Sequence, residues 1–207
     1  MPENPHFNIK NIRDYIVGVN QQVPLLDGSW RTYVNFDNAA STPSLVPVLD
    51  AVNDFAQWYS SVHRGTGYKS QVSTEVYDRA HEIVCRYVGA NPEDHAVILV
   101  KNSTEALNKL ARRLTPIGKR DIILNTLMEH HSNDLPWRKA AHLIHVGVNP
   151  DGSLSLEHLN QMLDRYADRV RLVAVTGASN VSGYLNPIHQ IAEKAHSIGA
   201  QILVDAA

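Results

Sequence analysis

The sequence predicts an α/β protein whose mainly parallel sheet carries helices on both faces. Short, continuously apolar runs recur along the chain, and such runs are typical of strands that are buried on both sides. Amphipathic segments with helical spacing separate these runs. Strands that alternate with helices in this way favour a parallel sheet. The length of 207 residues suits one large domain, or one domain with an appendage.

Five apolar runs are predicted as strands. They cover residues 96–100, 121–125, 142–148, 171–177 and 201–204. Helices are predicted at residues 46–61, 73–88, 103–114, 154–166 and 186–200, with a short one opening at 132–137. Residues 1–35 are predicted as an N-terminal arm or small-domain segment, and residues 36–207 as a partial large domain.

The helix at 73–88 has one apolar side at helical spacing, which predicts a buried face. Its members are Val76, Ala80, Ile83, Val84, Tyr87 and Val88. Cys85 lies beside this face and is interpreted as a small buried apolar residue rather than as a reactive thiol.

Composition excludes several classes of function. The net charge is -2 and no long run of one sign occurs, which argues against binding to nucleic acid or to a membrane surface. The N-terminus lacks the apolar core of a signal peptide, and no apolar run is long enough to span a membrane. A single cysteine rules out a disulfide within the chain and fits a reducing compartment. The expected location is the cytoplasm.

Polar residues follow the predicted strands, where ligands of open α/β sheets bind. Ser103 and Thr104 come after the first strand, His130 after the second, Asn180 after the fourth and Asp205 after the fifth. Because the carboxyl ends of parallel strands meet at one edge, we expect these five side chains to gather on one rim.

Each of these residues also has an ordinary structural interpretation. Ser103 or Thr104 could simply cap the helix that follows, although a phosphate could occupy the remaining N–H groups of the same turn. Asn180 suits a turn, and Asp205 suits the surface. The glycine patterns of the Walker and Rossmann phosphate sites do not occur in the chain.

The histidines do not form a metal-binding pattern. His130 and His131 are adjacent, and His142 and His145 are three apart on a predicted strand, so the members of each pair point to opposite faces. A histidine stacked on a flat ring is a better use of His130, and an exposed histidine is the plain alternative.

Six motifs in order resemble the class V aminotransferase fold, in particular the cysteine desulfurase and selenocysteine lyase group. They are FDNAAST, VHRGTG, NSTEALN, MEHHSN, GASNVSG and ILVDAA. The resemblance runs from about residue 33 to residue 207. It implies a fold type I enzyme that depends on pyridoxal 5'-phosphate (PLP), acts on an amino acid and forms a homodimer. It also implies a sheet in which the third, second, fourth and fifth strands are neighbours in that order.

The resemblance assigns a role to each site residue. Ser103 and Thr104 stand where the family binds the phosphate, although Asn102 replaces the glycine that usually precedes them. His130 would stack on the pyridine ring and assist proton transfer as the catalytic residue. Asn180 would bond the ring hydroxyl oxygen, and Asp205 would pair with the ring nitrogen. His63 and Arg64 fall in a loop near the family's active site and are weaker candidates.

The family's Schiff-base lysine and its small C-terminal domain match nothing in these 207 residues. The sequence is therefore expected to be the N-terminal part of a longer desulfurase-like enzyme and to be inactive alone. Another aminotransferase, epimerase or lyase of this fold remains open, as does a non-catalytic truncated paralogue or partner subunit. A nucleotide-binding α/β domain is a more distant alternative, because it lacks a glycine fingerprint.

Overall fold

The computed structural model describes residues 10–114 and 118–207. It divides into two compact units, one that ends at Leu99 and one that begins at Val100. Each unit is described by itself. The predicted arm, residues 1–35, belongs to the first unit; its first nine residues lie outside the described part, and its boundary at residue 35 stays a prediction.

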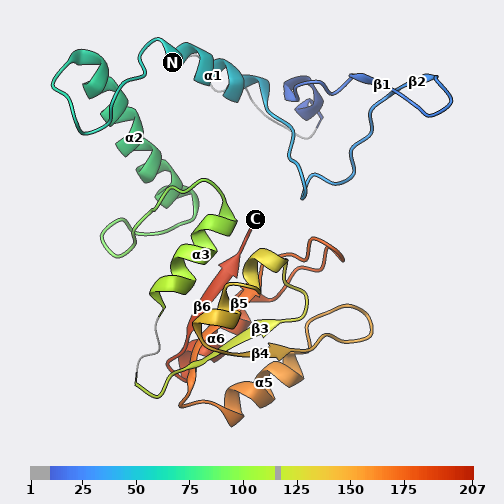
Figure 1. Cartoon of the computed structure of the whole chain (residues 1–207), viewed down its shortest axis with the longest axis vertical. Coiled ribbons are helices and arrows are strands. Elements are labelled where there is room, and N and C mark those ends of the chain that lie inside the picture. The colour runs from blue at the N-terminus through green and yellow to red at the C-terminus, as the bar shows by residue number, and fades with distance from the viewer. Residues whose placement is uncertain (1–9, 115–117) are drawn as a thin grey trace. The chain divides into compact units, whose positions relative to one another are not determined.

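Helices joined by long loops make up most of the regular structure of the first unit (Figure 1). Its elements are a 3₁₀ helix η1 (Ile12–Tyr15), an antiparallel pair β1 (Gln22–Pro24) and β2 (Trp30–Thr32), and helices α1 (Val46–Ala56) and α2 (Tyr68–Tyr87). The β1–β2 pair lies within residues 1–35, which the sequence indicated as an arm or small-domain segment without naming these strands. Two buried serines hold α2 against the preceding loop, because the hydroxyl of Ser70 donates to the carbonyl of Ser61 at 2.6 Å and that of Ser73 to Trp58 at 3.2 Å.

The predicted apolar side of α2 is largely exposed within its unit. Ile83 is 52% exposed and Tyr87 is 89% exposed, so this face lacks the cover that its spacing predicted. Cys85, by contrast, is 3% exposed, and its thiol donates to the carbonyl of Ala90 at 3.2 Å. The interpretation of Cys85 as a buried structural residue is confirmed.

The second unit is built on a four-stranded sheet in the order β4-β3-β5-β6. Its strands are β3 (Ile122–Thr126), β4 (His142–Val146), β5 (Val170–Thr176) and β6 (Gln201–Asp205). All three neighbouring pairs are parallel, which confirms the predicted fold class. The order also agrees with the one that the family resemblance implied for the third, second, fourth and fifth strands.

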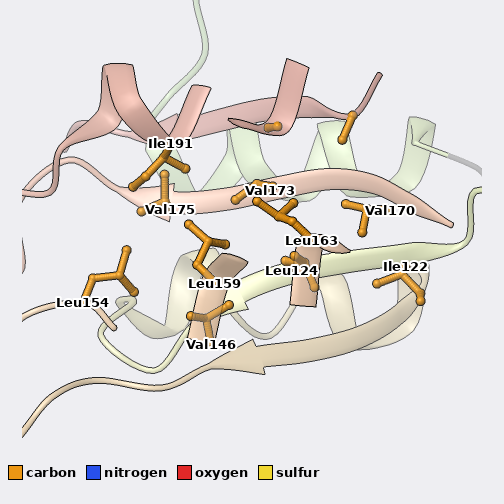
Figure 2. Packing of buried hydrophobic residues seen from close by; sticks show 12 residues of the cluster. Ile122, Leu124, Val146, Leu154, Leu159, Leu163, Val170, Val173, Val175 and Ile191 are labelled. Carbon is orange, nitrogen blue, oxygen red and sulfur yellow. The ribbon is translucent and has the colours of Figure 1, made fainter. Parts of the chain in front are cut away.

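Helices cover both faces of this sheet, as predicted. Alternate strand residues point to opposite faces, so that Leu124 and Val173 pack with α5 (Leu156–Arg165) and α6 (Ile188–Ser197). Figure 2 shows the packing of this larger cluster. On the other face, the strands pack with α3 (Ser103–Arg113) and with Trp137 of the short α4 (Trp137–Ala140).

The prediction of a strand at residues 96–100 is wrong for this structure. These residues have no strand hydrogen bonds, and Ile98 is 77% exposed. A strand persists only beside a partner that takes up its N–H and C=O groups, and none of the described strands pairs with this segment. The apolar run alone was therefore not enough to form a strand.

The ends of α6 follow the sequence signals. Pro187 occupies the cap position before the first turn, and Gly199 follows the last turn with a φ of +72°, a conformation that glycine adopts without strain. At the amino end of the sheet, the guanidinium of Arg120 donates to the carbonyls of Val170 at 2.5 Å and Ile198 at 2.7 Å. Within the described residues, no helix is both long and apolar enough to cross a bilayer.

Candidate functional site

The N-terminus of α3 is capped by Asn102. Its side-chain Oδ1 accepts a hydrogen bond from the backbone N–H of Glu105 at 2.9 Å. The alternative in which Ser103 or Thr104 caps this helix is therefore wrong: Asn102 comes first in the chain and already occupies the cap position, where an acceptor can reach the third N–H of the helix.

Capping by Asn102 leaves the next two residues with unused donors. Ser103 and Thr104 are exposed, and neither their hydroxyls nor their backbone N–H groups bond to another described residue. Four donors thus point outward at the positive end of an 11-residue helix. Such a set of donors is suited to a phosphate group.

His130 follows β3 and opens a single 3₁₀ turn, η2 (His131–Asn133). Its Nδ1 accepts a hydrogen bond from the backbone N–H of Ser132 at 3.2 Å, and the Ser132 hydroxyl lies 2.8 Å from the same nitrogen. Because Nδ1 is the acceptor, the neutral ring carries its proton on Nε2. The imidazole is exposed and therefore able to meet a ligand.

Two hollows flank the first turn of α3. A cleft of about 770 Å³ includes Thr104 and His130 in its lining, together with the cationic side chains of Arg112, Arg138 and Lys139. A groove of about 340 Å³ between α3 and β6 includes Ser103 and Asp205. The structure thus brings four of the five predicted residues to the carboxyl edge of the sheet, around one helix N-terminus.

Asp205 ends β6, opposite Thr176 of β5 in the parallel register. Its side chain is only partly buried, because β6 is the edge strand of the sheet as described, and its Oδ1 accepts from the N–H of Ala207 at 3.2 Å. Asn180 lies in the turn after β5, and its exposed side chain bonds to no described residue. It lines neither hollow.

One carboxylate at this rim was not identified from the sequence. Glu129, next to His130, is half-buried and takes part in a network of hydrogen bonds with β3, β5 and η2. Burial raises its pKa above the ordinary range, and the charge of Asp205 acts in the same direction, although three hydrogen bonds oppose the shift. The available signal was its position directly after a buried strand, beside the candidate histidine.

One of the two histidines on β4, His145, belongs to a small network of charged side chains. His145 Nε2 lies 2.8 Å from Asp134 Oδ1, and the other oxygen of Asp134 accepts from Arg138 at 2.5 Å. Among the residues that the structure describes, no group of three or more potential ligands is placed to hold a metal ion.

The two weaker candidates belong to the first unit. His63 has a φ of 54°, which is unusual for a residue with a side chain. Its N–H donates to the Thr74 hydroxyl at 3.0 Å, and its Nε2 lies 3.0 Å from Asp78. Arg64 follows it in the same loop and lines a pocket with it.

The groups at the rim fit PLP, the cofactor that the family resemblance implies. The open donors of Ser103 and Thr104 match its phosphate, and the carboxylate of Asp205 matches a protonated ring nitrogen. The flat imidazole of His130 matches a stacking surface. All four groups are exposed or half-buried, so a ligand could reach them.

Known proteins resemble this chain over most of its length. The class V aminotransferase sequence model matches residues 34–207. A cysteine desulfurase of Haloferax volcanii is 35% identical over 84% of this chain and 42% of its own length. One of Dickeya dadantii is 34% identical over 98% of this chain and 49% of its own length.

Solved structures show the same relationship. The apo cysteine desulfurase of Thermococcus onnurineus superposes with a TM-score of 0.78 at 28% identity, over 96% of this chain and 47% of that one. The cysteine desulfurase CsdA of Escherichia coli gives 0.72 at 26% identity, over 96% and 48%. The chain thus spans about half the length of the relatives it matches. On this evidence the chain belongs to the class V aminotransferase family.

Proposed function

We propose that this chain forms the N-terminal part of a PLP-dependent cysteine desulfurase, an enzyme that cleaves the C–S bond of L-cysteine. The observation that carries the proposal is the gathering of Ser103, Thr104, His130 and Asp205 around the first turn of α3. The reaction class is supported by the relatives, which are themselves named cysteine desulfurases.

Each candidate residue has a separate task in this proposal. The hydroxyls and N–H groups of Ser103 and Thr104 would bind the phosphate. The carboxylate of Asp205 would accept a hydrogen bond from the protonated ring nitrogen, and Asn180 would donate to the ring hydroxyl oxygen. His130 would lie against the ring and present its Nε2–H to the substrate side.

When bound, PLP supplies an electron sink for the bonds around the amino acid's Cα. The carboxylate of Asp205 would keep the ring nitrogen protonated, which is the state that withdraws electrons. Because Nδ1 accepts from the Ser132 N–H, Nε2 holds the ring proton, and His130 would assist proton transfer by donating a hydrogen bond from Nε2–H toward the substrate side. The buried thiol of Cys85 is not available as a sulfur acceptor. The thiol that accepts the sulfur of the substrate would therefore come from outside this chain.

Three other reactions of the same fold are the alternatives, and their products differ. The test is to incubate the full-length protein that carries this chain with PLP, L-cysteine and dithiothreitol, and to analyse the products. Desulfuration gives alanine and sulfide in equal amounts. Pyruvate with sulfide would instead show β-elimination, a sulfur-containing 2-oxo acid would show transamination, and D-cysteine would show epimerisation.

The matched variants for this assay are Asp205→Asn and Asp121→Asn. Both remove one carboxylate, but Asp121 lies at the far end of the sheet, where it pairs with Arg169 at 2.7 Å. The proposal expects alanine production to fall by more than tenfold in the first variant and to stay near the parent level in the second. Equal activity of the two variants would contradict the role given to Asp205.

We also propose that the full-length protein acts as a homodimer in the cytoplasm. The exposed apolar side of α2, which includes Ile83 and Tyr87, offers a surface that a second subunit could cover. The single buried cysteine is compatible with a reducing compartment. Sedimentation equilibrium of the full-length protein tests the dimer, and cell fractionation tests the location.

A further inference from the structure

Glu129 connects three elements at the rim of the sheet. Its Oε1 accepts from the hydroxyl of Thr126 at the end of β3 and from the backbone N–H of Thr176 on β5, the latter at 2.9 Å. Its Oε2 accepts from the side-chain Nδ2 of Asn133 in η2 at 2.6 Å. Both carboxylate oxygens are therefore used, and the backbone and amide partners can only donate.

Asn133 in turn fixes the turn that begins at His130. It is fully buried, its Oδ1 accepts from Trp137 Nε1 at 3.0 Å, and its carbonyl accepts from Asn125 Nδ2 at 3.0 Å. Its N–H closes the turn on the carbonyl of His130 at 2.8 Å. Inside that turn, the N–H of Ser132 is aimed at His130 Nδ1.

We propose that Glu129 is a positioning residue that acts through Asn133 to set the tautomer and orientation of the His130 imidazole. With Asn133 held, the turn keeps the Ser132 N–H on Nδ1, and the ring proton stays on Nε2. The chemical use of that proton rests on the proposed function, but the tautomer itself is a property of this chain without any ligand.

The network specifies a carboxylate at position 129. A glutamine there would keep one acceptor oxygen for Thr126 and Thr176, but its amide group would face the amide group of Asn133. Asn133 cannot rotate to correct this clash, because its oxygen is already held by Trp137. The substitution Glu129→Gln should therefore release the turn, even though it changes almost no volume.

Exchanging the two groups should repair the network. In the double variant Glu129→Gln/Asn133→Asp, the new glutamine amide donates to one oxygen of the new carboxylate at position 133. The other oxygen of that carboxylate still accepts from Trp137. The donors and acceptors match again, while the charge moves by four residues. Asp121→Asn serves as the control, because it removes a carboxylate at the opposite end of β3.

The test is ¹⁵N NMR of the ligand-free chain labelled at its histidines, at a pH where the rings are neutral. The two ring nitrogen shifts report which nitrogen carries the proton, and a His130→Asn sample identifies the signal among the 11 histidines. We expect a pure Nε2–H pattern in the parent chain and in Asp121→Asn. We expect a mixture of both tautomers in Glu129→Gln and recovery of the pure pattern in the double variant.

Several results would overturn the proposal. A proton on Nδ1 of His130 in the parent chain would overturn it, and this result needs no variant, so it counts even if Glu129→Gln does not fold. A folded Glu129→Gln chain with an unchanged tautomer does so as well, and so does a folded double variant that stays mixed. Because no cofactor is present, none of these results depends on whether the full-length protein is a desulfurase, which the product analysis decides separately.

Discussion

Substitutions of Asn102 should separate the stability of α3 from the anion affinity of its N-terminus. Asn102→Ala removes the acceptor that binds the Glu105 N–H at 2.9 Å, and loss of such a cap costs about 1 kcal/mol of folding free energy. Asn102→Asp keeps an acceptor and adds a negative charge at the positive end of the helix. That charge should preserve the stability or raise it by about 0.3–1 kcal/mol.

The same two variants should rank in a different order for phosphate binding. A carboxylate at position 102 lies next to the open donors of Ser103 and Thr104 and would repel an anion held there. At a separation of about 4 Å in a water-like medium, the repulsion is about 1 kcal/mol for each unit charge of the ligand, which corresponds to a roughly fivefold loss of affinity. Asn102→Ala adds no charge and should lose less affinity.

Two measurements on the chain check this inversion. Urea unfolding followed by circular dichroism gives the free energy of unfolding. We expect this free energy to be lowest in Asn102→Ala and, in Asn102→Asp, to equal or exceed that of the parent. Titration with pyridoxine 5'-phosphate, which lacks the reactive aldehyde of PLP, gives the affinity, with Asp expected to be lowest. A folded Asn102→Asp chain that binds this ligand as tightly as the parent would refute the placement of the phosphate at this turn.

Three further outcomes are expected in unfolding experiments. Arg120→Ala removes charge-assisted bonds, the two shortest of which go to the carbonyls of Val170 and Ile198, and should cost about 3 kcal/mol in urea unfolding; a cost below about 1 kcal/mol would contradict its role. Ile191→Ala empties a fully buried position and should cost about 2–5 kcal/mol by the same measurement, and a near-zero cost would contradict its place in the core. The raised pKa of Glu129 means that ionisation of this group costs more in the folded state than in the unfolded state, so the stability linked to its titration should be fully present at acid pH and be lost as pH rises from the ordinary glutamate range to the raised pKa. The difference in unfolding free energy between the parent and Glu129→Gln, followed across this range, should show that decline, and a flat difference would contradict it.

The strands of the sheet could be predicted because their signal is local. The run at β3 is continuously apolar over Ile122 to Leu124 and is buried throughout, so the pattern alone located the strand to within one residue. The run at residues 96–100 looks the same in the sequence but forms no strand. What differs is the presence of a neighbour, which a pattern of residues along one segment does not contain.

The candidate site was predictable in position but not in its internal bonds. Three residues with capping side chains follow one another at the start of α3, and the sequence could not indicate that Asn102 is the one that caps. The role of Glu129 depends on Thr176, which lies 47 residues away along the chain, and on the side chain of Asn133. Such contacts depend on the pairing of β3 with β5, so they become visible only in the folded sheet.

Amide NMR of the chain tests most directly whether the carboxyl edge of this sheet is a site for PLP. Pyridoxine 5'-phosphate should shift the amides of Ser103, Thr104, His130 and Asp205, whereas pyridoxine, which has no phosphate, should leave Ser103 and Thr104 unchanged. Equal effects of the two ligands on these amides, or shifts confined to residues away from this edge, would contradict the claim.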